Sequence, residues 1–386
     1  MDGGGIRGVM PARILEKIEE QLGGRLKDHF DLIAGTSTGS ILAVGIALGK
    51  SPKELLDLYL EKGLQIFPYQ KLFSPQRLPL IFKYGLSTPK FSDEGLISVL
   101  KEQFGEATFA DLTPKSDQGK PPLKVLVPSY DTQDRNPIIF KSWFHERWYA
   151  QVPVWEICVS SASAPTYFPA HRIEKNGQVY SLYHVRLYRL CKPKGEYLQE
   201  MMVFSCEGSL LSSSLFLLPS SFFLLPYLCY TRPMLPDMIL IDGGVCANNP
   251  VSCAVAEAIR ILRESPNQSL GSVIDQIKVI SIGTGDPASP IPWEKVRGWG
   301  LVQWGLRIAD VFMDAPPDVH RYVAEQIIGV GKNDDKSRYI RLQLPLKDPL
   351  LAMDDARETN LQALLKETDR YLDQEKERLE KFLANW

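Results

Sequence analysis

The sequence predicts an α/β protein whose central sheet is mainly parallel. Short apolar runs typical of buried strands, at 29–34, 123–128 and 277–282, alternate with longer stretches of helical periodicity. Such alternation is typical of folds in which helices connect strands of one sheet. With 386 residues, of which 44% are hydrophobic, the chain can bury a large core in one big domain or two.

A glycine-rich segment, residues 1–8, precedes the first predicted helix. Apolar residues recur on one helical face from Met10 to Leu22, and Gly23 and Gly24 end the helix. A glycine-rich loop that leads into a helix presents backbone N–H groups to an anion. The same letters fit a dinucleotide-binding fingerprint, but no strand precedes them here and no acidic residue on a following strand is evident at the usual distance. An oxyanion hole is therefore the better interpretation.

The segment 35–39, Gly-Thr-Ser-Thr-Gly, lies between the predicted strand 29–34 and an apolar helix at 40–48. A serine flanked by glycines at ±2, between a strand and a helix, is the pattern of a nucleophile elbow. The turn is so sharp that Ser37 would be strained and side chains at ±2 would collide. The alternative is an ordinary glycine-rich turn that matches the pattern by chance.

Three segments together resemble the signatures of the patatin-like phospholipase family. They read Asp-Gly-Gly-Gly-Ile-Arg-Gly at 2–8, Gly-Thr-Ser-Thr-Gly at 35–39 and Ile-Asp-Gly-Gly at 241–244, with further matches at 161–169, 248–250 and 281–285. The resemblance implies one domain over residues 1–386 with a three-layer α/β/α fold. It also implies a carboxylic ester hydrolase, a lipid acyl hydrolase that needs no metal or other cofactor and acts on phospholipids or galactolipids.

The same resemblance assigns roles to individual residues. Ser37 is the nucleophile and Asp242, after a predicted strand at 238–241, is the base of a Ser–Asp dyad. The amides of Gly3, Gly4 and Gly5 would hold the tetrahedral oxyanion, where one good donor contributes ~3 kcal/mol. Arg7 would brace this loop. The remaining glycines of the three signatures shape the turns: Gly8, Gly35, Gly39, Gly243 and Gly244.

Histidine offers no competing base in the sequence. The five histidines, at 29, 145, 171, 184 and 320, lie in no recognisable motif, and we expect surface or structural roles for them. An α/β-hydrolase triad would need an acidic residue and then a histidine downstream of the serine, a pattern we cannot assign.

Composition and charge exclude some classes of binding partner and cofactor. The net charge of −2 gives no basic field for nucleic acid. The six cysteines form no C-x-x-C pair, which argues against zinc and fits reduced thiols in a cytoplasmic protein. No basic-then-apolar leader opens the sequence. We expect a cytoplasmic protein with transient, peripheral contact to a membrane surface.

The sequence departs from the family pattern in two places. Family members have an apolar strand before the glycine-rich loop, whereas Met1 stands directly before Asp2 here. Either the gene model is truncated, or the loop is poorly anchored because the first strand is missing. Ser40 stands where a second glycine is common, a change that the start of the helix should tolerate.

The structure or role of four further segments is less clearly indicated by the sequence. The aromatic and basic stretch 67–91 is either a solvated loop with a few packed aromatics, which we favour, or an interfacial flap. Residues 179–236 form an atypical insertion, interpreted as a translated intron or else a membrane-associating insert. The tryptophans of 291–315 could line an acyl pocket, touch an interface or simply pack. Residues 353–386 predict a long C-terminal helix with a solvated charged face.

Two other functions compete with lipid hydrolysis. The missing strand and the insertion could leave a catalytically impaired protein that binds lipid or regulates a partner. The same chemistry could instead act on soluble acyl groups, as in an esterase or thioesterase. Serine and aspartate substitutions separate the first rival from an enzyme, and preference for vesicles separates the second.

Overall fold

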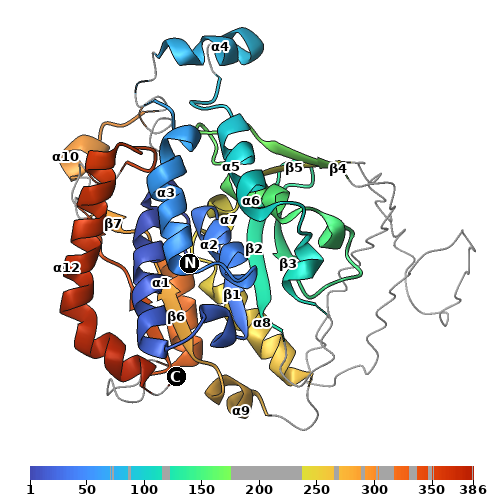
Figure 1. Cartoon of the computed structure of the whole chain (residues 1–386), viewed down its shortest axis with the longest axis vertical. Helices are drawn as coiled ribbons and strands as arrows, with labels where there is room; N and C mark the ends of the chain where they lie inside the picture. The colour runs from blue at the N-terminus through green and yellow to red at the C-terminus, as the bar shows by residue number, and fades with distance from the viewer. Residues whose placement is uncertain are drawn as a thin grey trace, which may run out of the picture. The chain divides into compact units, whose positions relative to one another are not determined.

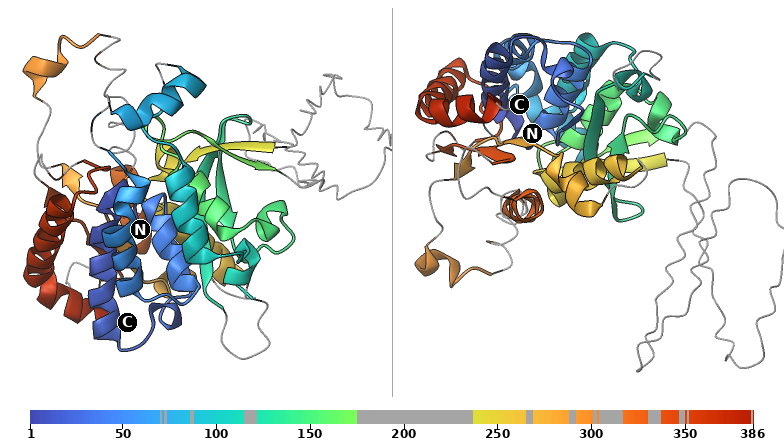
Figure 2. Two further views of the ribbon diagram at one scale, coloured as in Figure 1. Left: turned by 45° about the horizontal axis from the view of Figure 1, so that its top comes forward. Right: turned by 90° about the horizontal axis from the view of Figure 1, so that it is seen from below.

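The computed structural model of the chain is drawn in Figures 1 and 2. It describes residues 1–69, 71, 74–85, 88–114, 122–174, 237–264, 269–287, 292–300, 303, 317–329, 337–346, 350, 352–384 and 386. Met1–Ile173 and Met238–Trp386 form one compact unit and Glu174–Asp237 a second. The predicted insertion 179–236 lies outside the described residues, so its interpretation stays a prediction.

Nine described strands form a mixed sheet and two smaller parallel pairs. They are β1 (Leu32–Ala34), β2 (Lys124–Asp131), β3 (Asn136–Lys141), β4 (His171–Glu174), β5 (Asp237–Asp242), β6 (Val279–Ile282), β7 (Asp286–Pro287), β8 (Tyr339–Leu342) and β9 (Pro345–Leu346). The larger sheet has the order β1-β2-β5-β4, with β3 also on β2. The smaller pairs are β6 with β8 and β7 with β9.

The α/β prediction is confirmed, but the larger sheet is more mixed than the sequence suggested. β1 runs parallel to β2, whereas β3 and β5 are antiparallel to it. The reason for β3 is the short connection after Asp131, because a few residues can join only antiparallel neighbours. β2 is long enough to pair with β1 at its start and with β5 at its end.

Helices cover both faces of the strands. The described helices are α1 (Val9–Leu22), α2 (Thr38–Ala47), α3 (Pro52–Ile66), α4 (Leu78–Tyr84), α5 (Glu94–Phe104), α6 (Val154–Ala162), α7 (Gly244–Ala247), α8 (Val251–Arg263), α9 (Leu270–Asp275), α10 (Trp293–Val296) and α12 (Glu358–Leu383), with a further helical stretch at 317–328. The right view of Figure 2 shows the blue helices α1–α3 on one side of the strands and the gold α8 on the other. This arrangement is the three-layer α/β/α fold.

Local sequence explains where the first helices begin and end. Gly23 ends α1 with φ 66°, a left-handed conformation that glycine adopts readily. Ser51 and Glu54 form a capping box at the start of α3, and Pro52 occupies its first turn. α2 is mostly apolar, and every residue from Thr38 to Ile46 is buried. The predicted helices at 10–22 and 40–48 are confirmed.

The aromatic stretch 67–91 divides into a packed part and an exposed part. Phe67 and Phe91 are buried and contact each other and Phe168. The short helix α4 between them leaves the side chain of Phe82 87% exposed and that of Leu78 51% exposed. Neither of the two expectations for this stretch describes all of it.

The first two residues lie between β1 and β6, which belong to separate sheets. The amino group of Met1 donates to the Ala34 carbonyl (2.8 Å), and the Asp2 amide donates to the Ile282 carbonyl (3.0 Å). A cavity of about 430 Å³ continues beside Met1 and is lined by both strands and by α8. We call this cavity the β1–β6 slot.

Membrane insertion finds no support in the described helices. None of them combines the length and the hydropathy that a transmembrane span requires. Residues 179–236, for which a membrane-associating insert is one of the two interpretations, lie outside the described residues. Trp304 lies outside them as well, and Trp293 in α10 is 66% exposed.

Candidate active site

Ser37 occupies a sharp turn between β1 and α2. Its φ of 53° and ψ of −122° are rare for a residue with a side chain, and such strain gathers at functional sites. A Cβ atom on Gly35 would lie 2.0 Å from the Gly39 carbonyl oxygen, and one on Gly39 would lie 2.4 Å from the Met1 carbonyl oxygen. The expected collision of side chains at ±2 is thereby confirmed.

A serine of α6, Ser161, holds this turn in place. The Ser37 amide donates to Ser161 Oγ (2.9 Å), whose hydroxyl donates in turn to the Pro128 carbonyl on β2 (2.6 Å). The Ser161 carbonyl also accepts from the Gly243 amide (3.2 Å), directly after Asp242. Ser161 therefore ties the serine turn to the aspartate turn. Ser161 lies within the family match at 161–169, and the sequence predicted no role for it.

Asp242 is the last residue of β5 and is fully buried. Its Oδ1 accepts a hydrogen bond from the Gly244 amide (2.6 Å), while Oδ2 has no hydrogen-bond partner within the described residues. Burial raises the pKa of the Asp242 carboxyl to about 7, and the Gly244 amide and the Ser37 hydroxyl act in the opposite direction. The Ser37 hydroxyl is thus close enough to influence the carboxyl, without a hydrogen bond of normal geometry.

The glycine-rich loop lies directly beside Ser37. A Cβ atom on Gly3 would lie 3.1 Å from Ser37 Cβ, and one on Gly5, with φ 57°, would lie 2.2 Å from the Met353 carbonyl oxygen. The Gly3 amide already donates to the Asn248 carbonyl (3.1 Å), so it is not free to bind an oxyanion as expected. The amides of Gly4 and Gly5 find no acceptor in the part of the chain that the structure describes.

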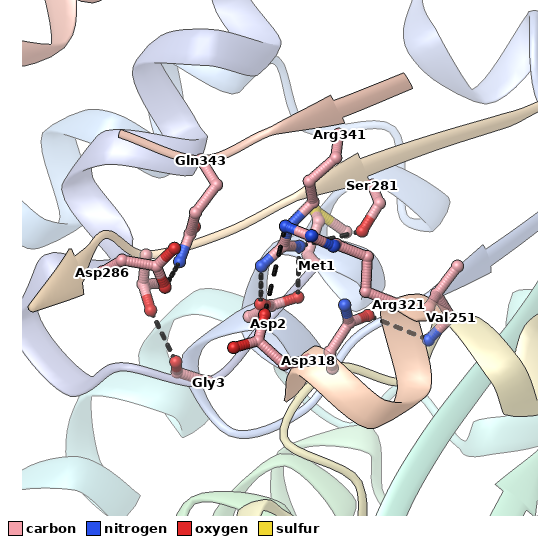
Figure 3. A network of polar contacts seen from close by, with 12 residues as sticks. Met1, Asp2, Gly3, Val251, Ser281, Asp286, Asp318, Arg321, Arg341 and Gln343 are labelled. Atoms are coloured by element: carbon pink, nitrogen blue, oxygen red, sulfur yellow. Dashed lines mark hydrogen bonds and ion pairs between the residues drawn. The ribbon is translucent and has the colours of Figure 1, made fainter. Parts of the chain in front are cut away.

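The loop is firmly anchored, so the alternative of a poorly held loop is wrong. Arg341 on β8 forms a two-point ion pair with Asp2 (3.0 and 2.5 Å) and also donates to Ser281 Oγ (2.8 Å), as Figure 3 shows. Arg7 is buried, and its Nε lies 3.5 Å from the Gly4 carbonyl oxygen, behind the loop. A Cβ atom on Gly8 would lie 2.1 Å from Thr38 Oγ1, so Gly8 allows the loop to meet α2.

Ser37, Asp242, Gly4 and Gly5 line one cavity of about 490 Å³. We call it the site pocket. The rest of its wall is almost entirely apolar and comes from α2, α3, α5 and the segment after α6. Representative lining residues are Ile41, Tyr59, Phe67, Leu96, Phe168 and Met353. Such a pocket, apolar with a few convergent polar groups, is suited to an acyl chain whose reactive end lies at those groups.

No histidine of the described chain lines the site pocket. His171 on β4 is buried beside Trp155, and burial lowers its pKa to about 4. His320 contacts Ser252 Oγ (2.6 Å) and the Cys246 carbonyl (3.1 Å). His184 lies outside the described residues. Among those that are described, no group of three or more His, Cys, Asp or Glu side chains could hold a metal ion.

An α/β/α fold with a strained serine and a buried carboxylate in one apolar pocket is typical of hydrolases that use a serine nucleophile. The family model described as patatin-like phospholipase matches residues 1–255. The chain therefore belongs to the patatin-like phospholipase family, and membership supports a lipid hydrolase.

Relatives match nearly the whole chain at low identity. Patatin-like protein 1 of Arabidopsis thaliana is 27% identical over 399 residues, covering 96% of this chain and 80% of the relative. Patatin-04/09 of Solanum tuberosum is 25% identical over 390 residues, covering 95% and 80%. The protein named Probable inactive patatin-3-Kuras 1, also of Solanum tuberosum, is 25% identical over 382 residues, covering 94% and 82%.

Proposed function

We propose that the chain is a metal-independent lipid acyl hydrolase with Ser37 as the nucleophile and Asp242 as the base. One observation carries the proposal: Ser37, Asp242, Gly4 and Gly5 line the same apolar pocket. A serine hydroxyl is a weak nucleophile until a base takes its proton. A carboxyl with a pKa of about 7 is well matched to that task near neutral pH.

In the first half of the reaction, the Ser37 hydroxyl gives its proton to Asp242 Oδ2, the carboxyl oxygen that has no hydrogen-bond partner within the described residues. Ser37 Oγ attacks the ester carbonyl carbon, and the carbonyl oxygen becomes an oxyanion. The amides of Gly4 and Gly5 stabilise this oxyanion. When the tetrahedral intermediate collapses, the C–O bond to the alcohol breaks and the alcohol leaves with the proton from Asp242.

In the second half, water replaces the alcohol. Asp242, again ionised, takes a proton from water, and the hydroxide attacks the carbonyl carbon of the acyl-Ser37 ester. Collapse of the second tetrahedral intermediate breaks the bond to Ser37 Oγ and returns the proton to that oxygen. The products are the alcohol and a free fatty acid; each turnover consumes one ester and one water molecule, and Ser37 and Asp242 are both regenerated.

We further propose a phospholipid or galactolipid as the substrate and transient contact with its membrane. The two ends of segment 67–91 lie beside the pocket: Phe67 lines it, and the Phe91 amide donates to the carbonyl of Tyr167, another lining residue (2.8 Å). The tip of the segment, α4, exposes Phe82 and Leu78 next to the exposed Lys83. Exposed apolar residues beside basic ones are suited to a lipid surface.

Ester hydrolysis by the full chain, with Ser37→Ala and Asp242→Asn beside it, tests the catalytic proposal. Fatty-acid release is measured from phosphatidylcholine and galactolipid vesicles and from a soluble short-chain ester. Each variant should lose at least about a thousandfold in kcat, and the double variant should be no worse, because the two residues act as a unit. Ser142→Ala is the matched control, because Ser142 is a buried serine that directly follows β3 and whose Oγ accepts from the Val125 amide on β2 (2.9 Å). Equal rates in all chains would refute the proposal.

Phe82→Ser tests the membrane contact separately. The variant should sediment less with vesicles and cleave vesicle lipid more slowly, while its rate on the soluble ester stays unchanged. Unchanged vesicle binding would contradict the assignment of α4. A parent that prefers the soluble ester over vesicles would point to an esterase instead.

A further inference from the structure

The segment 281–285, Ser-Ile-Gly-Thr-Gly, lies against the glycine-rich loop. It starts on β6, far from the loop in the sequence, and the proposed reaction gives it no part. The Ile282 carbonyl accepts from the Asp2 amide (3.0 Å). Thr284 Oγ1 donates to the Gly3 carbonyl (2.6 Å). Thr284 is therefore the side chain of this segment that contacts the loop next to Gly4.

The hydrogen bond from Thr284 fixes one peptide plane. The bond between Gly3 and Gly4 is trans, like every peptide bond the structure describes. In a planar trans peptide the carbonyl oxygen and the following N–H point in opposite directions. With the Gly3 oxygen directed toward Thr284, the Gly4 N–H is directed away from it. Gly4 lines the site pocket together with Ser37, and its amide has no other acceptor within the described residues.

The orientation of this peptide must be fixed by a contact from another part of the chain, because both residues that form the peptide are glycines. A peptide between two glycines meets few steric limits and can rotate between conformations that side chains would forbid. Thr284 supplies contact as well as a hydrogen bond. A Cβ atom on Gly4 would lie 2.3 Å from Thr284 Oγ1 and 2.5 Å from its Cβ. Thr284 is only 4% exposed, so its own position is fixed by its neighbours.

We propose that Thr284 is a positioning residue for the acyl-transfer reaction. Its hydroxyl holds the Gly3–Gly4 peptide in the orientation that keeps the Gly4 amide available to the oxyanion. The proposal rests on the proposed function, because the oxyanion exists only if Ser37 attacks an acyl ester. Thr284 touches neither substrate nor reacting atoms; it acts through Gly4. An amide aimed in advance at the developing charge stabilises the transition state more than the bound substrate.

Three substitutions test the hydroxyl in the full chain. Thr284→Val replaces the hydroxyl with a methyl group and should lower kcat on the soluble ester by about 10-fold to 100-fold, with KM changed by less than about twofold. Thr284→Ser keeps the donor and should stay within about threefold of the parent. Should Thr284→Val fail to fold, Thr284→Ser and Thr284→Ala form the decisive pair, because they differ only in the hydroxyl.

The matched control is Thr368→Val in α12. Thr368 is fully buried and its hydroxyl also donates to a backbone carbonyl, that of Leu364 (2.8 Å). Losing either hydroxyl should lower the free energy of unfolding by a similar amount. Only Thr284→Val should lower kcat and weaken inhibition by a boronic acid, which forms a tetrahedral adduct on serine. The apparent pKa of the rate profile should stay near that of the parent, because Asp242 is untouched.

The outcomes separate this proposal from the function on which it rests. A parent no more active than Ser37→Ala would refute both. An active parent with Thr284→Val at the parental kcat, or with Thr284→Ser as impaired as Thr284→Val, would overturn the role of Thr284 alone. A loss of kcat in Thr368→Val equal to that in Thr284→Val would also overturn it, since general destabilisation would then explain the effect.

Discussion

The site pocket and the β1–β6 slot have similar volumes, about 490 and 430 Å³, and both have mainly apolar walls. They differ in the polar groups that reach them. The pocket has a strained serine, a buried carboxyl and two amides without acceptors within the described residues. The slot is lined by residues of β1, β6 and α8, and neither Ser37 nor Asp242 is among its lining residues.

The comparison shows that cavity size does not identify a site. A cavity can take part in chemistry only where groups of complementary function converge on one point. In the pocket those groups come from three segments far apart in the sequence, at 4–5, 37 and 242. The two cavities are close to the same loop: Met1 lines the slot and Gly4 lines the pocket. Substitutions near this loop and in the two cavities can therefore measure how independent the slot and the pocket are.

The largest expected effect concerns the ion pair that anchors this loop. Arg341→Met leaves the Asp2 carboxyl buried without its partner, since the two side chains are only 9% and 3% exposed. Loss of one member of a buried pair lowers the free energy of unfolding by about 3–5 kcal/mol. Urea unfolding measures the loss. Arg378→Met, which breaks the exposed pair with Glu375, should change it by no more than about 0.5 kcal/mol. Equal losses would mean that the loop anchor is dispensable.

A second prediction concerns the cost of a buried carboxyl in the site pocket. The pKa of Asp242 is raised from 3.8 to about 7, so the folded state favours its protonated form. Its contribution to stability is fully present below pH 3.8 and is lost as the pH rises through 7. Asp242→Asn, neutral at every pH, should therefore raise the free energy of unfolding at pH 8 by at most about 4 kcal/mol.

Unfolding measured from pH 5 to pH 8 checks this sign. The advantage of Asp242→Asn should shrink toward pH 5. Asp355→Asn is the opposite control, because the guanidinium of Arg357 lowers the pKa of Asp355, and its loss should destabilise the protein at pH 8. A destabilised Asp242→Asn at pH 8 would contradict the burial argument.

The same carboxyl predicts the pH dependence of the reaction. Asp242 can accept the Ser37 proton only when it is ionised, so kcat/KM should rise with pH through an apparent pKa of about 7. On a neutral soluble ester the rate at pH 5 should be about 100-fold lower than at pH 8. A profile that is flat between these values, in a chain that stays folded at both, would exclude Asp242 as the base.

Local patterns made much of the fold and of the serine turn predictable. Ser37 and its glycines lie within five residues, and the collision that requires Gly35 can be argued from the turn alone. Helix α3 begins at its capping box because both members, Ser51 and Glu54, are neighbours in the sequence. The role of Asp242 as a base could be predicted only from the family resemblance, since an Asp-Gly-Gly turn by itself does not indicate a catalytic residue.

Long-range contacts explain what the sequence did not reveal. The Gly3 amide is occupied by the Asn248 carbonyl, and Asp2 pairs with Arg341, 339 residues away. No local pattern encodes either contact. The aromatic stretch 67–91 shows the same limit, because composition could not tell which rings pack, as Phe67 does, and which remain exposed, as Phe82 does. The mixed sheet likewise follows from pairing that only the folded chain displays.

The smallest expected effect compares one substitution in both cavities. Ala258→Leu adds apolar volume to the wall of the slot, and filling a cavity of this kind should raise the free energy of unfolding by about 1 kcal/mol with no change in kcat. Ala162→Leu adds the same volume to the site pocket, where it competes with the acyl chain, so kcat/KM for a long-chain ester should fall while a short-chain ester is spared. If Ala258→Leu lowers hydrolysis as Ala162→Leu does, the slot and the pocket are coupled through residues 1–5, and the division between a structural cavity and a chemical one fails.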